Sequence, residues 1–200
     1  MIDRFYPVVP SAEWVARLVP AGARFIQLRI KDQPEAELRR EVREAQAVCV
    51  KHGAQLIVND YWQIAIDEKC PWVHLGQEDL VDADVGAIRR AGLLLGVSTH
   101  DHAELDKGLS VDPDYVALGP IYPTLLKKMP FAPQGLDRIG EWKKLVGAKP
   151  LVAIGGLTLD RARLCLEAGA DSAAVVGDIV NNADPVAQAE KWIAGTRRAA

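Results

Sequence analysis

The sequence predicts a single-domain α/β fold, a (β/α)8 or TIM barrel, that spans residues 1–200. Short apolar runs rich in β-branched residues alternate with helix-like segments, and eight such runs can be counted. The runs are nearly continuous in apolar residues, as expected of parallel strands whose two faces are covered. Eight strand–helix units also close into a barrel, although 200 residues is the lower end of the size range for this fold.

The main alternative is an open doubly wound sheet. Its nucleotide-binding version is disfavoured because no G-x-G-x-x-G motif opens a helix after the first run and no Walker A sequence occurs. The closed barrel is therefore the predicted architecture.

The predicted elements follow one another in a regular order. The eight predicted strands cover residues 5–9, 25–30, 56–59, 72–76, 94–99, 115–120, 150–156 and 172–179. Apolar residues that recur three or four positions apart predict an amphipathic helix over residues 34–52. Another helix is predicted over residues 159–169, with Thr158 or Asp160 as its N-cap and Gly169 at its end.

Composition excludes several classes of protein. Lys and Arg total 24 against 27 Asp and Glu, so a net charge of −3 gives no electrostatic footprint for nucleic acid or an anionic membrane. No apolar stretch reaches the length of a membrane span, and the N-terminus lacks the apolar core of a secretory signal. We expect a cytoplasmic protein. Its three scattered cysteines, Cys49, Cys70 and Cys165, are expected to be buried apolar residues rather than disulfides or zinc ligands.

Polar and apolar residues alternate at the end of the second predicted strand. Gln27, Arg29 and Lys31 share one face, and the apolar residues between them suit the helix-covered outside, so the three polar side chains are expected to point into the barrel. Two cations inside a barrel are costly unless an anion meets them. One interpretation is an internal ion-pair network with Asp or Glu. The other, which we favour, is a site for phosphate or diphosphate.

Acidic residues follow the third and fourth predicted strands. Asn59 and Asp60 come at the end of the third, and Gln77, Glu78 and Asp79 follow the fourth. Because the two strands are adjacent, the carboxylates of Asp60 and Asp79 can share one hard cation, and Mg²⁺ typically takes one or two carboxylates plus phosphate oxygens. The alternative for each of these two residues is a helix N-cap. Glu78 is expected to be solvated.

The remaining strand ends carry hydroxyl, lysine and glycine residues. Ser98 and Thr99 close the fifth strand, where they bind a ligand or cap the next helix. A long proline-rich loop after the sixth strand carries Lys127 and is either a lid that brings a cation to a bound anion or a plain surface loop. Gly156 and Gly177 expose backbone N–H groups ahead of helices, a pattern typical of phosphate cradles at the last two strands of such barrels.

The histidines are interpreted as structural. His74 lies within the fourth predicted strand and is expected to be a satisfied core residue or a support for the site rather than a base. His100 and His102 flank Asp101 without a third metal ligand in sight, so a polar loop or helix start is expected there.

Several strand-end strings occur together in an order that carries a family resemblance. They are QLRIK, LIVND, VHLGQEDL, GVSTH, YVALGPIYPT with the following Lys127, AIGGL and the AVV of the last strand. In this order they resemble the thiamine-phosphate synthase family over nearly the whole chain. The resemblance implies a (β/α)8 barrel that condenses 4-amino-2-methyl-5-hydroxymethylpyrimidine diphosphate with 4-methyl-5-(2-phosphoethyl)thiazole, gives thiamine phosphate and releases pyrophosphate. It implies Mg²⁺ as the cofactor and leaves a homodimer as an open expectation.

The resemblance also implies roles for individual residues. Those implied to hold the diphosphate are Arg29, Lys31, Asn59 and Lys127. Those implied to bind Mg²⁺ are Asp60 and Asp79. Gln27 and Ser98 are implied to face the pyrimidine diphosphate. The thiazole phosphate is implied to contact Thr124, Gly156 and the backbone around Val176 and Gly177. The residues expected to carry catalysis are Arg29, Lys31, Ser98 and Lys127.

The sequence departs from the family pattern at two places. Leu125 and Leu126 follow Thr124 where the family commonly has a second Thr, and Gly177 stands where Ser is frequent. Two other functions are weighed on this basis. A thiazole tautomerase-like isomerase on the same barrel tends to have a catalytic His where this chain has Pro120, and tends to lose the acidic pair. A non-catalytic barrel that binds phosphate ligands is the other.

Overall fold

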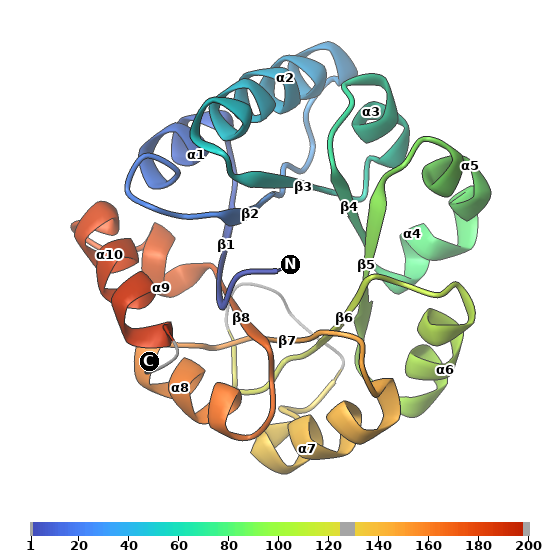
Figure 1. The fold of residues 1–200 in the computed structure, drawn as a ribbon, viewed down its shortest axis with the longest axis vertical. Helices are drawn as coiled ribbons and strands as arrows, with labels where there is room; N and C mark the ends of the chain where they lie inside the picture. Colours follow the sequence, from blue (N-terminus) through green and yellow to red (C-terminus); the bar gives the residue numbers. More distant parts are fainter. Residues whose placement is uncertain (1, 125–130, 198–200) are drawn as a thin grey trace.

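In the computed structural model, which describes residues 2–124 and 131–197, eight parallel strands close into a barrel in sequence order. They are β1 (Phe5–Val9), β2 (Phe25–Leu28), β3 (Gln55–Asn59), β4 (Trp72–Leu75), β5 (Leu94–Thr99), β6 (Tyr115–Leu118), β7 (Leu151–Ile154) and β8 (Ser172–Val175). Figure 1 looks along the barrel and shows these strands inside an outer ring of helices. The predicted barrel is confirmed, and the open sheet is excluded because β1 pairs with β8, Phe5 opposite Ala173.

Helices follow every strand and cover the outside of the barrel. They are α1 (Ala12–Leu18), α2 (Glu35–His52), α3 (Trp62–Asp67), α4 (Gln77–Asp82), α5 (Val85–Arg90), α6 (His102–Ser110), α7 (Gly135–Val146), α8 (Leu159–Glu167), α9 (Gly177–Val180) and α10 (Pro185–Thr196). The predicted helices over 34–52 and 159–169 correspond to α2 and α8. Of the two candidate N-caps of α8, Thr158 accepts a hydrogen bond from the Arg161 backbone N–H. None of the described helices has the length and apolarity needed to cross a membrane.

Two hydrophobic clusters hold the barrel together. The larger one fills the space between strands and helices and contains Ile26, Leu28 and Ile30, as the alternation in the sequence predicted. The smaller one fills the barrel interior and is rich in aromatic side chains from four strands: Tyr6, Phe25, Trp72 and Tyr115. Ile2 packs against this inner cluster from the amino-terminal side of β1. The interior is therefore a packed core and not a channel.

Several predicted strands were too long at their carboxyl ends. The predictions over 25–30, 115–120, 150–156 and 172–179 are corrected to ends at Leu28, Leu118, Ile154 and Val175. At β7 the cause is local, because Gly155 and Gly156 have φ of +103° and +64°, outside the extended region. After β8, Gly177 starts α9 instead of continuing the strand. The predicted site residues therefore lie mostly on loops just past the strands, where this fold places its chemistry.

The three cysteines are free and buried, as the sequence predicted. Burial raises the pKa of each thiol, at Cys49, Cys70 and Cys165, to about 12. At neutral pH they are protonated, apolar packing residues and not nucleophiles.

Candidate active site

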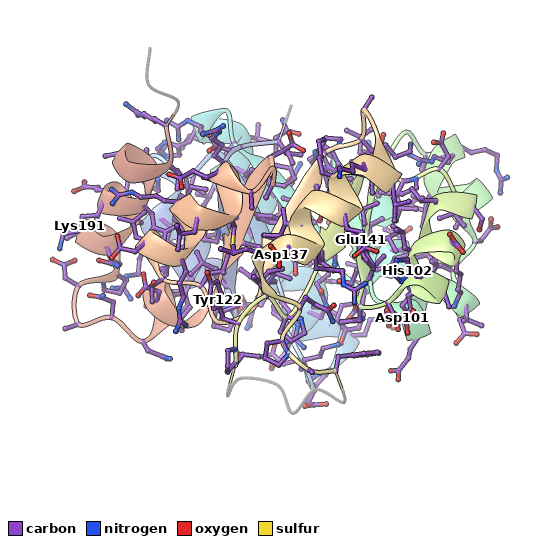
Figure 2. All side chains as sticks on the ribbon, turned by 90° about the horizontal axis from the view of Figure 1, so that it is seen from below. Asp101, His102, Tyr122, Asp137, Glu141 and Lys191 are labelled. Atoms are coloured by element: carbon purple, nitrogen blue, oxygen red, sulfur yellow. The ribbon has the colours of Figure 1, made fainter. Side chains whose placement is uncertain are left out.

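The candidate site lies at the carboxyl ends of the strands, which we call the mouth of the barrel. Parallel pairing brings these ends to one side of the molecule. Figure 2 views the barrel from the side, and Asp101 and Tyr122, which follow β5 and β6, lie toward the same end. Side chains from well-separated parts of the sequence can therefore meet there.

Arg29 and Lys31 do not point into the barrel as predicted. β2 ends at Leu28, so both cations lie beyond the strand and are exposed, whereas Gln27 within the strand is only 5% exposed and bonds to Tyr6 of the inner cluster. At the mouth the cations keep their hydration, which burial would remove at a high cost. Among the ion pairs of the described residues, none includes Arg29.

Asp60 is held in place by two donors at the mouth. Lys31 Nζ and Asn59 Nδ2 each lie 2.5 Å from Asp60 Oδ2. The backbone of Asp60 has φ of +65°, uncommon for a residue other than glycine, and its N–H donates to the His74 carbonyl at 2.8 Å. The ion-pair interpretation of Lys31 is therefore right about an acidic partner but wrong about a place inside the barrel. It pairs at the mouth rather than inside the barrel, with its side chain 46% exposed.

Asp79 lies in the first turn of α4 and is close to Asp60. Burial raises the pKa of Asp79, and the charge of Asp60 and a hydrogen bond between the two carboxyl groups raise it further, while Lys31 lowers it. Gly76 makes room for this arrangement, because a Cβ there would lie 3.0 Å from Asp79 Oδ2. The N-caps of α3 and α4 are Tyr61 and Gly76, so the alternative of a helix cap is wrong for both acids.

Two neighbouring carboxyl groups, of which Asp79 has a raised pKa from burial and from the charge of Asp60, fit a divalent cation, since bound positive charge would relieve their repulsion. Within residues 2–124 and 131–197, no group of three or more His, Cys, Asp or Glu could hold a metal ion. A pair of carboxylates could supply two oxygen ligands, with water and phosphate as the others, and oxygen ligands suit Mg²⁺ rather than zinc. Glu78 is exposed, as predicted.

A chain of hydrogen bonds crosses the barrel interior and ends at Ser98. Gln27 Nε2 donates to the Tyr6 hydroxyl at 2.6 Å, and that oxygen lies 2.8 Å from the Tyr115 hydroxyl. The Tyr115 hydroxyl is 2.7 Å from His74 Nδ1, and His74 Nε2 is 2.8 Å from Ser98 Oγ. Burial lowers the pKa of His74 to about 4, so the ring is neutral at physiological pH. The prediction of a satisfied core histidine is confirmed.

Sequence reasoning missed the two tyrosines of this chain, which read as ordinary members of apolar strands. A signal was present in Gly96, in the middle of β5. A Cβ at Gly96 would lie 2.0 Å from the Tyr115 ring, so only glycine leaves space for that side chain. A glycine inside an apolar strand often marks such a close approach.

The loops after β6 and β7 are packed against each other. A Cβ on Gly156 would lie 2.4 Å from the Pro123 carbonyl oxygen. Arg161, which the sequence did not single out, donates from Nη1 to the Gly156 carbonyl at 2.6 Å, and its guanidinium lies 4.6 Å from the centre of the Tyr122 ring. The glycine therefore sets the distance between two loops of the mouth.

The residues predicted to meet the thiazole phosphate follow three neighbouring strands. Thr124 follows β6, Gly156 follows β7, and Val176 and Gly177 follow β8 directly. Lys127, with Leu125 and Leu126, lies outside the described residues.

The segment after β5 starts a helix. The Asp101 side chain accepts from the Glu104 N–H at 2.9 Å and caps α6, so the hydroxyl pair before it is not the cap. His100 Nδ1 lies 2.6 Å from Glu104 Oε2, and His102 Nε2 lies 2.7 Å from Glu141 Oε1 (Figure 2). The prediction of a polar helix start at these histidines is confirmed.

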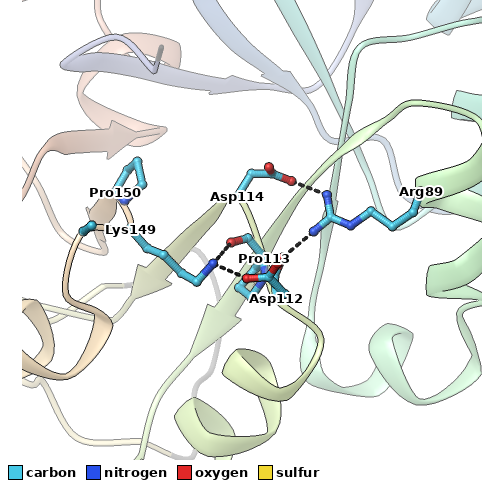
Figure 3. Close-up of a pocket in the computed structure, with 7 residues that line it drawn as sticks. Arg89, Asp112, Pro113, Asp114, Lys149 and Pro150 are labelled. Carbon is cyan, nitrogen blue, oxygen red and sulfur yellow. Dashed lines mark hydrogen bonds and ion pairs between the residues drawn. The ribbon is translucent and has the colours of Figure 1, made fainter.

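A pocket lies at the opposite, amino-terminal ends of β6 and β7 (Figure 3). Each cation there faces a carboxylate: Arg89 pairs with Asp114 at 2.5 Å, and Lys149 pairs with Asp112 at 2.5 Å. Lys149 also donates to the Pro113 carbonyl at 3.0 Å. With its charges paired, this pocket offers little to an anionic ligand, and its place in the fold indicates a role in stability.

Comparisons with known proteins show the family of this chain. The family model described as thiamine monophosphate synthase (TMP-TENI) matches residues 5–179. A thiamine-phosphate synthase of Rhizobium etli is 60% identical over 98% of this chain and 96% of its own length, and one of Cronobacter sakazakii is 51% identical over 96% and 89%. The solved thiamine phosphate pyrophosphorylase of Pyrococcus furiosus shares the fold, with a TM-score of 0.85 at 24% identity over 96% of this chain and 95% of its own. This chain is a member of the thiamine monophosphate synthase family.

Proposed function

We propose that this protein is an active thiamine-phosphate synthase. It condenses 4-amino-2-methyl-5-hydroxymethylpyrimidine diphosphate with 4-methyl-5-(2-phosphoethyl)thiazole and releases pyrophosphate. The observation that carries the proposal is the meeting of Lys31, Asp60 and Asp79 at the mouth, where Arg29 is a further exposed cation without an ion pair among the described residues. Such a set suits the loss of a highly charged leaving group, because the developing charge needs neutralisation.

The diphosphate would bind on the side of β2 and β3. Arg29 is exposed and forms no ion pair within the described residues, so it can meet phosphate oxygens without breaking another contact. Lys31 would exchange its carboxylate partner for the diphosphate. Asn59 would donate from the amide that now contacts Asp60. Lys127, which the family resemblance adds to this set, would complete it from the loop after β6.

Asp60 and Asp79 are the residues that would hold Mg²⁺. Their adjacency supports this assignment, because the charge of Asp60, after burial, raises the pKa of Asp79, and a bound cation would relieve that repulsion. When bound, Mg²⁺ would neutralise charge on the leaving diphosphate. A metal at Asp60 would also take over the role that Lys31 plays in the ligand-free protein, leaving the ammonium group for the substrate.

The two organic substrates would be aligned by the opposite sides of the mouth. Gln27 and Ser98 would face the pyrimidine, and the residues that follow β6, β7 and β8 would receive the thiazole phosphate. Diphosphate departs first, the electron-rich aminopyrimidine stabilises the resulting cation, and the thiazole nitrogen attacks. Holding both partners in line makes the capture nearly unimolecular. This route needs no protein nucleophile.

The tautomerase alternative has less support. Pro120 stands where that branch tends to have its catalytic His, and the acidic pair that it tends to lose is present as Asp60 and Asp79. We further propose a cytoplasmic location, in keeping with three free cysteines. A homodimer is proposed as the assembly, to be tested by light scattering on the purified protein.

The deciding experiment mixes the purified protein with both phosphorylated substrates and MgCl₂ and measures thiamine phosphate by chromatography. Product that requires both substrates and the divalent ion supports the proposal. A folded protein that binds the substrates but makes no product would favour the non-catalytic binding barrel. Product formed at full rate in the presence of a chelator would contradict the assignment of Asp60 and Asp79.

A further inference from the structure

The buried chain from Gln27 to Ser98 has a direction that its hydrogen-bond donors determine. We propose that Gln27, Tyr6 and Tyr115 fix His74 as its Nε2–H tautomer, so that Ser98 accepts from His74 and turns its own proton toward the mouth. Tyr6, Tyr115 and His74 are then positioning residues that act through Ser98. The catalytic consequence rests on the proposed function, whereas the tautomer itself does not.

The direction starts at Gln27, because an amide N–H can only donate. The Tyr6 hydroxyl accepts from Gln27 Nε2, and its partners among the described residues are Gln27 and Tyr115. The single proton of Tyr6 must therefore go to the Tyr115 oxygen. Tyr115, having accepted, gives its own proton to His74 Nδ1. Nδ1 is then an acceptor, and the proton of the ring lies on Nε2, from which it is donated to Ser98 Oγ.

Other proton arrangements leave a buried group unsatisfied. If His74 donated from Nδ1, Tyr115 would have to donate to Tyr6, and the Tyr6 proton would have no acceptor beside the Gln27 amide nitrogen. A doubly protonated ring also donates from Nδ1, so it leaves the Tyr6 proton without an acceptor in the same way. An unsatisfied buried hydroxyl costs about 1–3 kcal/mol, enough to make one arrangement dominate.

Packing keeps the chain in one geometry and keeps water out. Tyr6 is 1% exposed, Tyr115 0% and His74 7%. The rings of His74 and Tyr115 stack, with centroids 5.6 Å apart, and Tyr6 meets Tyr115 edge-on at 6.1 Å. The Tyr115 ring fills the space that the missing side chain of Gly96 leaves. Without water to exchange partners, the orientation of the Gln27 amide is passed on through four hydrogen bonds to Ser98.

The consequence is a specificity for the atom that Ser98 contacts. The backbone of Ser98 is held by Gln77, whose Nε2 donates to the Ser98 carbonyl at 2.7 Å. With Oγ already accepting from His74, the hydroxyl has its proton to offer. Ser98 would therefore donate its proton to a hydrogen-bond acceptor of the substrate, such as a phosphate oxygen or a ring nitrogen.

The first test reads the tautomer directly in the ligand-free full chain. Long-range ¹H–¹⁵N correlation spectra distinguish the protonated from the bare nitrogen of each of the four histidines, and the spectrum of His74→Gln identifies the His74 signals. We expect a protonated Nε2 and a bare Nδ1. A protonated Nδ1 would overturn the proposal. Because this readout needs no turnover, it stays valid if the proposed function fails.

The second test uses variants that break the chain. Tyr6→Phe removes the link between Gln27 and Tyr115, so the His74 signals are expected to move toward a mixture of tautomers. Thr99→Val is the matched control, because it deletes a buried hydroxyl next to Ser98 that donates to the Ala117 carbonyl and accepts from the Trp142 indole, outside the chain. It is expected to leave the His74 signals in place. Equal effects of both variants would show that loss of packing, and not the chain, controls the ring.

Kinetics separate positioning from a structural role. Tyr6→Phe and Ser98→Ala are each expected to lower kcat about tenfold, the size seen when a supporting hydrogen bond to a functional group is removed. The double variant should lose no more than Ser98→Ala alone, because both changes act through the same hydroxyl. Losses that multiply in the double variant would refute a role of Tyr6 through Ser98.

Discussion

At the scale of single residues, Asp60 carries the largest share of the proposed chemistry. Asp60→Asn keeps the size of the side chain and tolerates the φ of +65°, but it removes the charge that Lys31 now meets. We expect kcat to fall on the order of 10²–10³-fold, as for loss of a group that stabilises transition-state charge, with an unchanged melting temperature. Glu78→Gln is the control, because it neutralises an exposed neighbour outside the acidic pair. Comparable losses in both variants would contradict the assignment.

Arg29 offers a second test at this scale. Because its guanidinium is exposed and unpaired within the described residues, Arg29→Ala should leave the free energy of unfolding unchanged. We expect kcat/KM for the pyrimidine diphosphate to fall about 100-fold, since a charge-assisted contact to the leaving group is lost. The KM for the thiazole phosphate should not move. Arg40→Ala removes another exposed cation, on α2, whose ion pair with Glu44 is a surface contact, and should have no effect. A uniform rise in both KM values would count against a diphosphate site.

The residue types at the mouth could be predicted from the sequence, but their orientations could not. Period-2 alternation placed Gln27, Arg29 and Lys31 on one face, and Ile30 beyond the strand still packs in the outer cluster as that period predicts. The strand itself ends at Leu28, so Arg29 and Lys31 lie past the barrel wall and are exposed. The role of Tyr115 was beyond prediction, because its partners come from three other strands and no local pattern records them.

At the scale of elements, strand and helix positions were predictable because each carries its own periodicity, whereas ends depend on neighbours. The carboxyl end of β7 shows this, since Gly156 is required both by its own φ and by the approach of the loop after β6. α8 was located correctly, and Thr158 was among its predicted caps, because a cap depends only on residues close to it in the sequence. Contacts between two loops depend on residues far apart in the sequence, so no local pattern predicts them.

Gly156 can be tested against a glycine of the same backbone conformation. Gly156→Ala faces both a φ of +64° and the Pro123 carbonyl oxygen 2.4 Å from the new Cβ, whereas Gly53→Ala has a φ of +65° with nothing within 4 Å. The left-handed conformation alone costs about 1 kcal/mol. We expect urea unfolding to show about that loss for Gly53→Ala and a loss larger by about 1–3 kcal/mol for Gly156→Ala. A raised KM for the thiazole phosphate in Gly156→Ala alone would link the loop contact to the site. Equal losses of stability would show that the close contact relaxes freely.

At the scale of the whole molecule, the barrel divides its polar groups between its two ends and its interior. Charges at the amino-terminal end are paired with each other, as at Arg89 and Lys149 (Figure 3), and support stability. At the mouth two acids lie close together, and burial together with the charge of Asp60 raises the pKa of Asp79. The interior meets the mouth at His74, whose burial lowers its pKa to about 4 and keeps the ring uncharged at neutral pH.

The burial of an uncharged His74 predicts how the stability of the protein depends on pH. The pKa of His74 falls from an ordinary 6.5 to about 4 on folding. Between these two pH values the unfolded chain binds a proton on this ring and the native state does not. The contribution of the neutral ring to the free energy of unfolding is fully present above pH 6.5. It is lost as the pH falls toward 4, and the total loss is about 3 kcal/mol. Urea unfolding at several pH values between 7.5 and 4 should show this slope in the native sequence. His74→Gln has no ring to protonate, so its free energy of unfolding should lack the part of the pH dependence that comes from His74. If the two proteins lose stability in parallel on acidification, the histidine is not held neutral by burial.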